Sequence, residues 1–447
     1  MRRLYQILLM ISVLFGGVAS AQDPASTTAT ATSDVIDTST DYLSDEGWRR
    51  LPREARRARS RAQMLARFEP SGIPSAEKLD TYIERFRQIN IYDPRLATFK
   101  VRADRVPGTT GTVKLEGEVS VGRYKSGIES ALQNLNFTVA ENRIAVLPAE
   151  ELGADIYGLS TTAAATMRKE PRDRSEQVNS VPLGGMVRLL RVGRQDDLTT
   201  ANAGWRGGGT RSRHGEAGQG ENSAPTALEA GDWYLAQTSE GYLGFMRSDE
   251  IWRTNQYRLA DGVLTRPTTV TVEDETMVLP VGTLLCSTST GYALGPRGKR
   301  IMVEHSMAGF GRPVFTSQQV LDLMKPLMGV RYVWGGVTDR GIDCSGFTQF
   351  LWKTKGINLP RDAEEQATVG QIVAWGKDVE KAAQPGDLIF FMNESGRVNH
   401  VAVSLSGKSI IHSSGQDVHL SDLDEKKEDM DASMLDRILY ARRVQGR

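Results

Sequence analysis

The sequence predicts a multidomain protein with a small α/β domain near its N-terminus, two all-β barrels in the middle and a C-terminal α+β domain. Three observations support this fold class. The chain has 447 residues, which is too long for one ordinary domain. Its middle third consists of short alternating apolar runs separated by glycine turns, which is typical of small barrels. Its last third has helical apolar spacing followed by two antiparallel strands, which is typical of an α+β domain.

The overall charge of the chain is balanced. Lysine plus arginine and aspartate plus glutamate each number 55, so the formal net charge is zero. A balanced charge gives no reason to expect nucleic acid or an anionic membrane as a partner. We expect no cofactor, and the sequence does not indicate an oligomeric state.

The N-terminus has the three regions of a secretory signal. Basic residues precede the apolar stretch Ile7–Val18, and the small residues Ala19-Ser-Ala21 follow it, so we expect residues 1–21 to be removed on export. The apolar stretch is too short for a comfortable membrane span, and no later segment is long enough. Residues 22–44 are rich in Ser, Thr, Ala and Asp, which predicts a disordered linker. We therefore expect a periplasmic or cell-envelope protein.

Residues 45–150 are predicted to form an arginine-rich helix and a small α/β domain. The segment Trp48–Phe68 has no sustained apolar stripe, so we expect a solvated helix, with binding to an anionic wall polymer as the alternative. Ser75 is positioned to cap an amphipathic helix. The apolar face of that helix consists of Leu79, Tyr82, Ile83 and Phe86.

Strands and one further helix complete this domain. We expect a turn at Glu141-Asn142 between the last two strands. The domain faintly resembles BON-type domains, which bind membranes or envelope components, and a plain structural module is the alternative. The predicted elements are strands at Phe99–Val101 and Val113–Leu115, a helix at Tyr124–Leu135, and strands at Phe137–Val139 and Ile144–Val146.

Residues 155–254 are predicted to form the first barrel and residues 255–312 the second. The first resembles bacterial SH3-type domains in runs such as Leu183–Leu190 and in the Gly241-Tyr-Leu-Gly-Phe245 motif. Residues 194–230 are rich in Gly, Arg and Ser, which predicts a mobile loop inserted in this barrel. The second barrel is predicted only from strand-like runs, including Thr268–Val272 and Gly282–Leu285.

Cys344 begins an amphipathic helix in the C-terminal domain. Phe347, Phe350 and Leu351 follow at helical spacing, and Gly356 is a suitable C-terminal cap. Unpaired backbone N–H groups and the positive end of the helix dipole favour a thiolate at such a position. The sequence therefore predicts a nucleophilic cysteine. Cys286 lies in an apolar run and is expected to be a buried small hydrophobe.

Two histidines are predicted to lie side by side near the C-terminus. Val398–Leu405 and Lys408–Ser413 read as two strands joined at Ser406-Gly407. Antiparallel pairing about Ser406 would place His400 directly opposite His412, with both side chains on one face. His400 would then serve as the base for Cys344, and His412 would orient it. A zinc site is a less attractive reading, because these three residues have no close pair with metal-ligand spacing.

These motifs, taken together, resemble the NlpC-type papain-like cysteine peptidases, which cut the stem peptides of bacterial cell walls. The resemblance covers residues 315–447. It departs from the family at Arg331, where proline is usual, and at Ala402 and Ser404. The motifs are Tyr332-x-Trp-Gly-Gly, Asp343-Cys-Ser-Gly, Leu359-Pro-Arg-Asp, Pro385-Gly-Asp-Leu, His400-Val and the later His412.

The resemblance implies roles for residues around the nucleophile. The hydroxyl of Tyr332 would help to stabilise the oxyanion, and Trp334 of the same motif would contact the substrate. Asp343 and Ser345 would hold the amino end and backbone of the substrate, although capping of the helix by Asp343 is an alternative. Arg361 and Asp362 precede another helix and are expected to form a structural ion pair.

Family members with SH3-type domains imply a more specific function. They are γ-D-glutamyl-L-diamino acid endopeptidases of the dipeptidyl-peptidase VI type, which act on peptidoglycan stem peptides or muropeptides. In them an acidic residue and a tyrosine of the first barrel surround the free amine of L-Ala. Glu176 and Tyr242 are the candidates here, and the alternative is that both are ordinary surface residues. The resemblance thus implies trimming of released fragments.

Two other functions remain open on the sequence. An amidase or acyltransferase could use the same fold and residues, because these fix acyl transfer but not the acyl donor. A wall-binding scaffold with a degenerate catalytic domain is the other alternative. The sequence does not distinguish diaminopimelate from lysine at the third stem position.

Overall fold

The computed structural model describes residues 52–198, 232–272, 275–289, 291–295, 300–301, 314–423 and 432–444. The predicted signal sequence, the predicted linker and most of the 194–230 insertion lie outside these residues. The chain divides into two units, Met1–Arg61 and Ala62–Arg447, and all of the sheets belong to the second. Among the described helices, none is long and apolar enough to cross a membrane.

Helices open the described part of the chain. α3 (Arg53–Phe68) covers most of the predicted arginine-rich helix. The predicted amphipathic helix is confirmed as α4 (Leu79–Asn90), with its expected apolar face buried. It is preceded by the short 3-10 helix η2 (Ala76–Lys78), which Ser75 caps by accepting a hydrogen bond from the Glu77 N–H.

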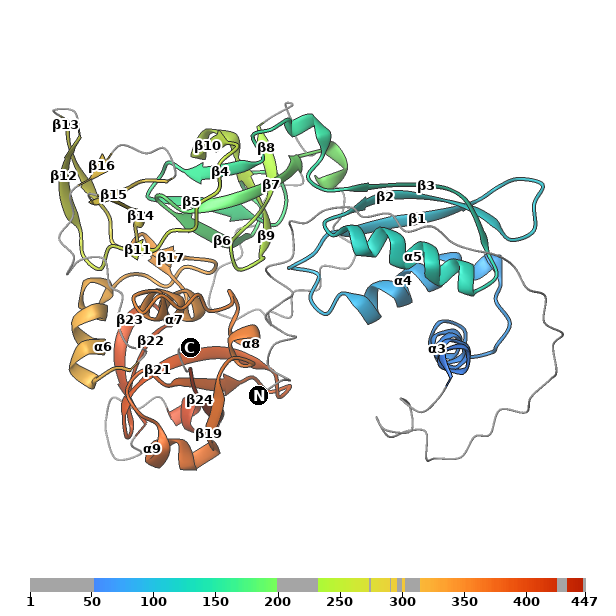
Figure 1. The fold of residues 1–447 in the computed structure, drawn as a ribbon. Helices are drawn as coiled ribbons and strands as arrows, with labels where there is room; N and C mark the ends of the chain where they lie inside the picture. The colour runs from blue at the N-terminus through green and yellow to red at the C-terminus, as the bar shows by residue number, and fades with distance from the viewer. Residues whose placement is uncertain are drawn as a thin grey trace. The chain divides into compact units, whose positions relative to one another are not determined.

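A three-stranded sheet packs against α4 and α5 (Gly122–Asn134), which cover one face of it (Figure 1). β1 is antiparallel to β2, and β3 runs parallel to β2 through the α5 crossover. The predicted turn at Glu141-Asn142 is wrong, because both residues lie inside one continuous strand. Pairing with β2 continues across them, with a register shift at Val113/Lys114. The strands are β1 (Phe99–Arg105), β2 (Thr112–Val119) and β3 (Thr138–Val146).

The middle of the chain forms a seven-stranded antiparallel sheet in the order β10-β4-β7-β8-β9-β5-β6. Within the described residues no pairing joins β10 to β6, so the sheet is not a closed barrel there. The strands are β4 (Tyr157–Ser160), β5 (Ala164–Arg168), β6 (Gln177–Pro182), β7 (Met186–Val192), β8 (Trp233–Gln237), β9 (Leu243–Arg247) and β10 (Ile251–Thr254).

The first residues of the predicted mobile insertion are anchored. They form the short 3-10 helix η4 (Gln195–Leu198), in which Asp197 is buried. Asp197 pairs with Arg191 at 2.7 Å and with Lys100 at 2.8 Å. A buried carboxylate held by two cations is costly to displace, so the prediction of a mobile loop is wrong for these four residues.

Two small sheets follow. One has the order β11-β14-β15-β16, and the other pairs β12 with β13. Cys286 lies on β14, is 1% exposed and has a free thiol, which confirms its predicted burial. The strands are β11 (Gly262–Val263), β12 (Thr268–Val272), β13 (Glu275–Leu279), β14 (Leu284–Thr288), β15 (Gly291–Ala293) and β16 (Arg300–Ile301).

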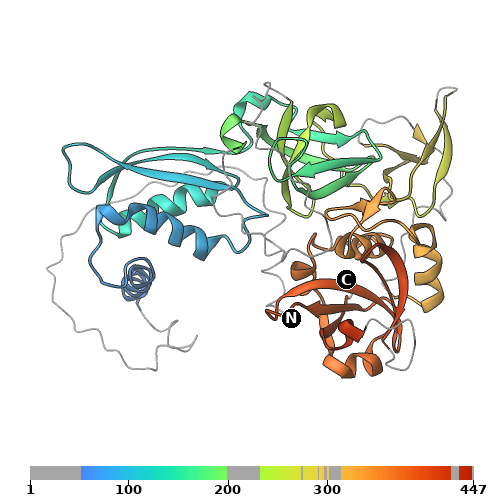
Figure 2. The same cartoon turned by 180° about the vertical axis from the view of Figure 1, so that it is seen from behind.

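The C-terminal domain is built on a six-stranded antiparallel sheet in the order β19-β24-β20-β21-β22-β23, seen in red from both sides in Figures 1 and 2. Its helices are α6 (Ser317–Met324), α7 (Cys344–Lys353), α8 (Ala363–Gln366), α9 (Val379–Ala382) and α10 (Ala432–Leu435). Its strands are β19 (Gln371–Trp375), β20 (Leu388–Met392), β21 (Val398–Ser406), β22 (Ser409–Ser414), β23 (Asp417–Asp422) and β24 (Ile438–Arg443), together with a hairpin of β17 (Val337–Thr338) and β18 (Gly341–Ile342).

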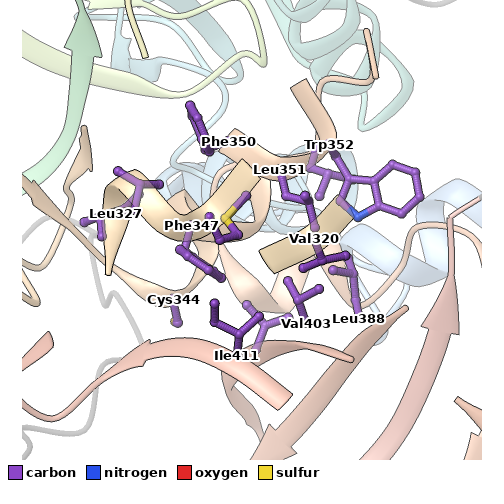
Figure 3. Packing of buried hydrophobic residues seen from close by; sticks show 14 of the residues in the cluster. Val320, Leu327, Cys344, Phe347, Phe350, Leu351, Trp352, Leu388, Val403 and Ile411 are labelled. Carbon is purple, nitrogen blue, oxygen red and sulfur yellow. The ribbon is translucent and has the colours of Figure 1, made fainter. Parts of the chain in front are cut away.

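The core of this domain holds α7 against β21 and β22. Phe347 and Leu351 of α7 are fully buried, as are Val403 and Ile411 of the strands, and all four lie in one cluster beside Cys344 (Figure 3). Burial of each such side chain contributes about 2–3 kcal/mol. This packing holds the start of α7 rigidly over the two strands that carry the histidines.

Candidate active site

Cys344 is the first residue of α7, as predicted, and Asp343 is its N-cap. Oδ1 of Asp343 accepts a hydrogen bond from the Gly346 N–H at 2.7 Å, and Oδ2 accepts one from the Gly335 N–H at 2.8 Å. Capping of the helix by Asp343, which the sequence left as an alternative, is therefore confirmed. Cys344 itself is 5% exposed.

The charge state of Cys344 is opposite to the prediction. Burial, and after it the negative charge of Asp343, raises the pKa of the Cys344 thiol to about 12. The Arg361 charge and backbone N–H groups act in the other direction but are outweighed. The expectation that the helix start favours a thiolate is wrong for the resting site, because desolvation penalises the charged form more than the helix end stabilises it. Cys344 is a neutral thiol at neutral pH.

His400 and His412 lie side by side, as predicted, but not by the predicted register. Nε2 of His400 is 2.9 Å from Nδ1 of His412. β21 and β22 pair Val403 with Ile411, and an irregularity follows between Ser404 and Ser406. This register puts His412 opposite position 402, so the predicted direct pairing of the two histidines is wrong. They are diagonal neighbours on one face, a distance that long side chains span.

The hydrogen bonds around His412 fit a pair of tautomers in which His400 can act as a base. Nε2 of His412 lies 2.9 Å from Oγ of Ser421 on β23. If the His412 Nε2–H donates to Ser421, then Nδ1 of His412 accepts the Nε2–H of His400. Nδ1 of His400 then carries the free lone pair. Ser421 was not found from the sequence, since only the pairing of β22 with β23 brings it to His412.

His400 is neutral in this site. Desolvation of the partly buried imidazole, with smaller contributions from the nearby Arg437 and His419, lowers the pKa of His400 to about 3. A neutral imidazole with one lone pair can accept a proton from a neutral thiol when a substrate stabilises the developing charges.

Tyr332 lies next to the sulfur atom of Cys344. Its hydroxyl forms a hydrogen bond with Cys344, and burial together with the nearby Cys344 and Asp343 raises the pKa of Tyr332 above its usual value. The phenol is therefore neutral and can donate a hydrogen bond. The backbone N–H of Tyr332 is held by the Gln416 carbonyl at 2.8 Å, which fixes this segment beside β23.

A buried ion pair lies directly behind the nucleophile. Nη2 of Arg361 is 2.6 Å from Oδ2 of Asp343, and Nη1 is 2.8 Å from Oγ of Ser345. Asp343 and Arg361 are only 4% and 1% exposed. Nε of Arg361 donates to Oδ1 of Asn179, on β6, at 2.7 Å. Arg361 thus joins the helix start to the preceding β domain.

The expected ion pair between Arg361 and Asp362 does not form. Arg361 binds Asp343, whereas Asp362 forms its ion pair with Arg95. Both residues are therefore in structural ion pairs, but with partners distant in sequence. Neither Arg95 nor Asn179 could be found from local patterns, because each reaches the site through tertiary contacts.

The remaining predicted residues divide into two groups. Tyr242 is 4% exposed and lies close enough to Asp362, Arg361 and Arg95 for their charges to act on its pKa, which burial raises. Glu176 does not join this group: its side chain is 52% exposed and lies 3.6 Å from Nζ of Lys169. Trp334 is 50% exposed. The structure thus brings Tyr242 to the site and leaves Glu176 at the surface.

The arrangement is suited to acyl transfer. A soft nucleophile, an imidazole base, a group that orients this base and a phenol donor lie on adjacent elements. Within the described residues, no group of three His, Cys, Asp or Glu side chains is placed to hold a metal ion.

Known proteins share this C-terminal region. Residues 329–437 match the model of the NlpC/P60 family. A gamma-D-glutamyl-L-lysine dipeptidyl-peptidase of Bacillus cereus is 28% identical over an alignment of 213 residues, which covers 41% of this chain and 62% of that protein. An enzyme of the same name from Bacillus subtilis is 32% identical over 132 residues, which are 29% of this chain and 43% of that protein.

Two further proteins are similar to parts of this chain. A probable endopeptidase NlpC homolog of Haemophilus influenzae is 42% identical over 101 residues, 22% of this chain and 50% of that protein. A crystal structure of an NlpC/P60 family protein from Bacillus cereus aligns with a TM-score of 0.46 and 18% identity, covering 65% of this chain and all of the other. The chain spans between 43% and 62% of the lengths of these three relatives. Together with the family match, they identify the C-terminal part of this chain as a domain of the NlpC/P60 family.

Proposed function

We propose that this protein is an exported cysteine endopeptidase that hydrolyses the bond between γ-D-Glu and the diamino acid of peptidoglycan stem peptides. The observation that carries the proposal is the line of hydrogen bonds from His400 to His412 and Ser421, beside a cysteine at a helix start. The names of the Bacillus relatives support this bond as the target, because both are gamma-D-glutamyl-L-lysine dipeptidyl-peptidases.

The first half of the reaction forms an acyl-enzyme. Sγ of Cys344 attacks the γ-carbonyl carbon of D-Glu while Nδ1 of His400 takes the thiol proton. The charge on the resulting imidazolium is stabilised by the hydrogen bond to His412, which Ser421 holds in the matching tautomer. The Tyr332 hydroxyl and the Cys344 backbone N–H donate to the oxyanion.

The second half releases the products. His400 gives its proton to the amine of the diamino acid as the carbon–nitrogen bond breaks and the thioester remains. A water molecule, deprotonated by the same imidazole, then attacks the thioester. The thiol is restored, and the peptide leaves with a free γ-carboxylate on D-Glu.

Substrate contacts on the acyl side are proposed for Asp343, Ser345, Tyr242 and Trp334, with Glu176 as a more remote candidate. The sequence expectation of a free L-Ala amine requires a carboxylate that can take up a positive charge. Asp343 is already paired with Arg361, and Glu176 lies beside Lys169 at the surface. The preference for a free amine therefore stays a prediction.

The other domains are proposed to position this catalytic domain in the cell envelope. The assignment of residues 155–254 and 255–312 as SH3-type domains, and of 45–150 as a BON-like domain, stays a prediction. Export to the periplasm likewise stays a prediction, because the predicted signal sequence lies outside the described residues.

Defined stem peptides followed by mass spectrometry test the proposed function. We expect L-Ala-γ-D-Glu and a diamino acid-containing product from peptides with either diaminopimelate or lysine, and no product from Cys344→Ala. Chelators are expected to leave the rate unchanged. Cleavage of an amide at the muramic acid linkage would instead identify an amidase, and transfer to an added amine would identify an acyltransferase. Binding of peptidoglycan without cleavage would identify a scaffold.

A further inference from the structure

A third histidine lies against the pair formed by His400 and His412. His419 stands directly opposite His412 in the pairing of β22 with β23. The centroids of these two rings are 4.7 Å apart and their planes meet at 63°, which is an edge-to-face contact. The rings of His400 and His412 make the same kind of contact, at 5.1 Å and 68°. Three imidazoles on three neighbouring strands therefore touch one after another.

His419 is held in one orientation by Asp417, which lies two residues before it on β23. Nδ1 of His419 is 3.1 Å from the backbone carbonyl oxygen of Asp417 and 3.2 Å from its Oδ1. A carbonyl and a carboxylate both accept hydrogen bonds, so Nδ1 is the donor in this contact. Nε2 is then the atom at which the ring takes up a further proton. The two side chains are 41% and 42% exposed, so water can exchange that proton.

Other charged groups lie at both ends of this line of rings. Arg331 is paired with Asp417 in an isolated bridge next to β23. At the other end, Nη2 of Arg437 donates to Oδ1 of Asn399, the residue before His400. Desolvation lowers the pKa of His400 most, and the nearby Arg437 and His419 lower it further. His419 is therefore close enough to the base to act on it electrostatically.

The charge of His419 bears directly on the transfer of the thiol proton. That transfer places a positive charge on His400, which the 2.9 Å hydrogen bond to His412 helps to stabilise. A positive charge on His419, on the far side of the His412 ring, repels it. A neutral His419 imposes no such cost. Asp417 offsets part of the repulsion, and water and salt screen part of the rest, so the effect is bounded.

We propose, resting on the endopeptidase function above, that His419 is a positioning residue that acts through His412 and slows cleavage when it is protonated. In its neutral form, His419 supports the ring of His412 without opposing the imidazolium on His400. Histidine side chains change charge between pH 5 and 8, so the brake acts at the acid end of this range. We expect the protonated form to be about three- to tenfold slower, because the two like charges are separated by a ring and one of them is half exposed.

His419→Phe tests the proposal, since it keeps a ring against His412 but cannot be charged. The value of kcat is measured for the variant and for the wild type on the same stem peptide at pH 5, 6, 7 and 8. The ratio of the two values cancels any titration of the substrate. We expect the ratio of variant to wild type to rise by about three- to tenfold from pH 8 to pH 5, and to rise less at high salt. A ratio that is constant, or that falls towards pH 5, overturns the proposal.

Two further variants separate the charge of His419 from its structural contribution. His419→Gln is also neutral, and it should give the same rise if His419→Phe does not fold. Leu420→Ala is the matched control, because Leu420 is the next residue on β23, is 52% exposed and lies on the other face of the strand. Its ratio to the wild type should be the same at pH 5 and pH 8. A rise in Leu420→Ala equal to that in His419→Phe would assign the effect to the strand and overturn the role of His419.

The same measurements distinguish this inference from the proposed function. If the wild type does not cleave the γ-D-Glu bond of the stem peptide at any pH, the proposed function fails and the inference falls with it. Cleavage of that bond with a constant ratio in a folded His419→Phe protein, shown by circular dichroism, leaves the proposed function intact and rejects only the inference.

Discussion

Nε2 of His400 lies 2.9 Å from Nδ1 of His412, although the two residues are not opposite each other in the sheet. In the sheet, His400 on β21 lies opposite Phe391 on β20, and His412 on β22 lies opposite His419 on β23. The contact therefore depends on the diagonal reach of two imidazoles across β21 and β22. A change in register of one residue would turn His412 to the other face of the sheet and break its hydrogen bonds with His400 and Ser421.

Removal of either reacting group should abolish cleavage. We expect Cys344→Ala and His400→Ala each to lower kcat by about 10⁴-fold, because one removes the nucleophile and the other its base. His412→Ala should leave a measurable remnant, since an orienting group is partly dispensable. The rate is followed by mass spectrometry on a defined stem peptide, with circular dichroism as the folding control. Wild-type turnover in Cys344→Ala would refute the cysteine peptidase assignment.

Ser421→Ala should reduce kcat by about tenfold while KM changes little, because the hydroxyl acts only through the tautomer of His412. Ser414 offers a matched control: its hydroxyl lies 3.4 Å from the same nitrogen, which is a much weaker contact. Ser414→Ala is expected to change kcat less than Ser421→Ala. Equal effects of both substitutions would argue against Ser421 as the group that orients His412.

The resting site should contain a neutral thiol and a neutral imidazole. With the pKa of Cys344 raised to about 12 and that of His400 lowered to about 3, the thiolate fraction at pH 7.5 is about 10³-fold below that of an ordinary cysteine. The rate of iodoacetamide labelling should therefore be low and rise about tenfold per pH unit between pH 7 and 10. Cys286, also buried, is expected to react only on unfolding.

An opposite outcome of the labelling experiment has a clear meaning. Fast labelling with an inflection below pH 8, lost in His400→Ala, would demonstrate a preformed thiolate and imidazolium pair. In that case the helix end would outweigh desolvation after all.

The ion pair of Asp343 and Arg361 should be strongly coupled. Asp343→Asn or Arg361→Met alone leaves a buried charge without its partner and is expected to lower the free energy of unfolding by about 3–5 kcal/mol. The double variant should cost less than the two single changes added together. Urea denaturation of all four proteins measures the coupling. Additive effects would show that the pair contributes nothing beyond its individual contacts.

Glu365 should make stability depend on pH. Burial, with the nearby Asp362, raises its pKa to about 7 from the ordinary 4.5. The folded protein therefore binds this proton more tightly than the unfolded chain, so stability falls as the pH rises from about 4.5 to about 7. The loss is at most roughly 3 kcal/mol. Glu365→Gln removes the titration and should flatten this part of the pH profile in urea denaturation at pH 5 and 8. A wild-type profile that is flat there would contradict the expectation.

The sequence by itself determined the features that depend on local order. Cys344 at the start of a helix with Phe347 and Leu351 on its buried face follows from helical spacing and a capping Asp343. The placement of His400 and His412 on one face follows from the two-residue period of strands. The amphipathic face of α4 is predicted for the same reason.

Tertiary structure decided the rest, because charge state, register and partner choice depend on neighbours that are distant along the chain. Burial raised the pKa of Cys344 and outweighed the effect of the helix dipole. The strand pairing, with its irregularity after Ser404, placed the two histidines diagonally. The guanidinium of Arg95 is separated from Asp362 by more than half of the chain, and a salt bridge of that kind has no local sequence signal. Local periodicity therefore predicts the face on which a side chain lies. Its exposure to solvent, its charge state and its ion-pair partners depend on the folded chain.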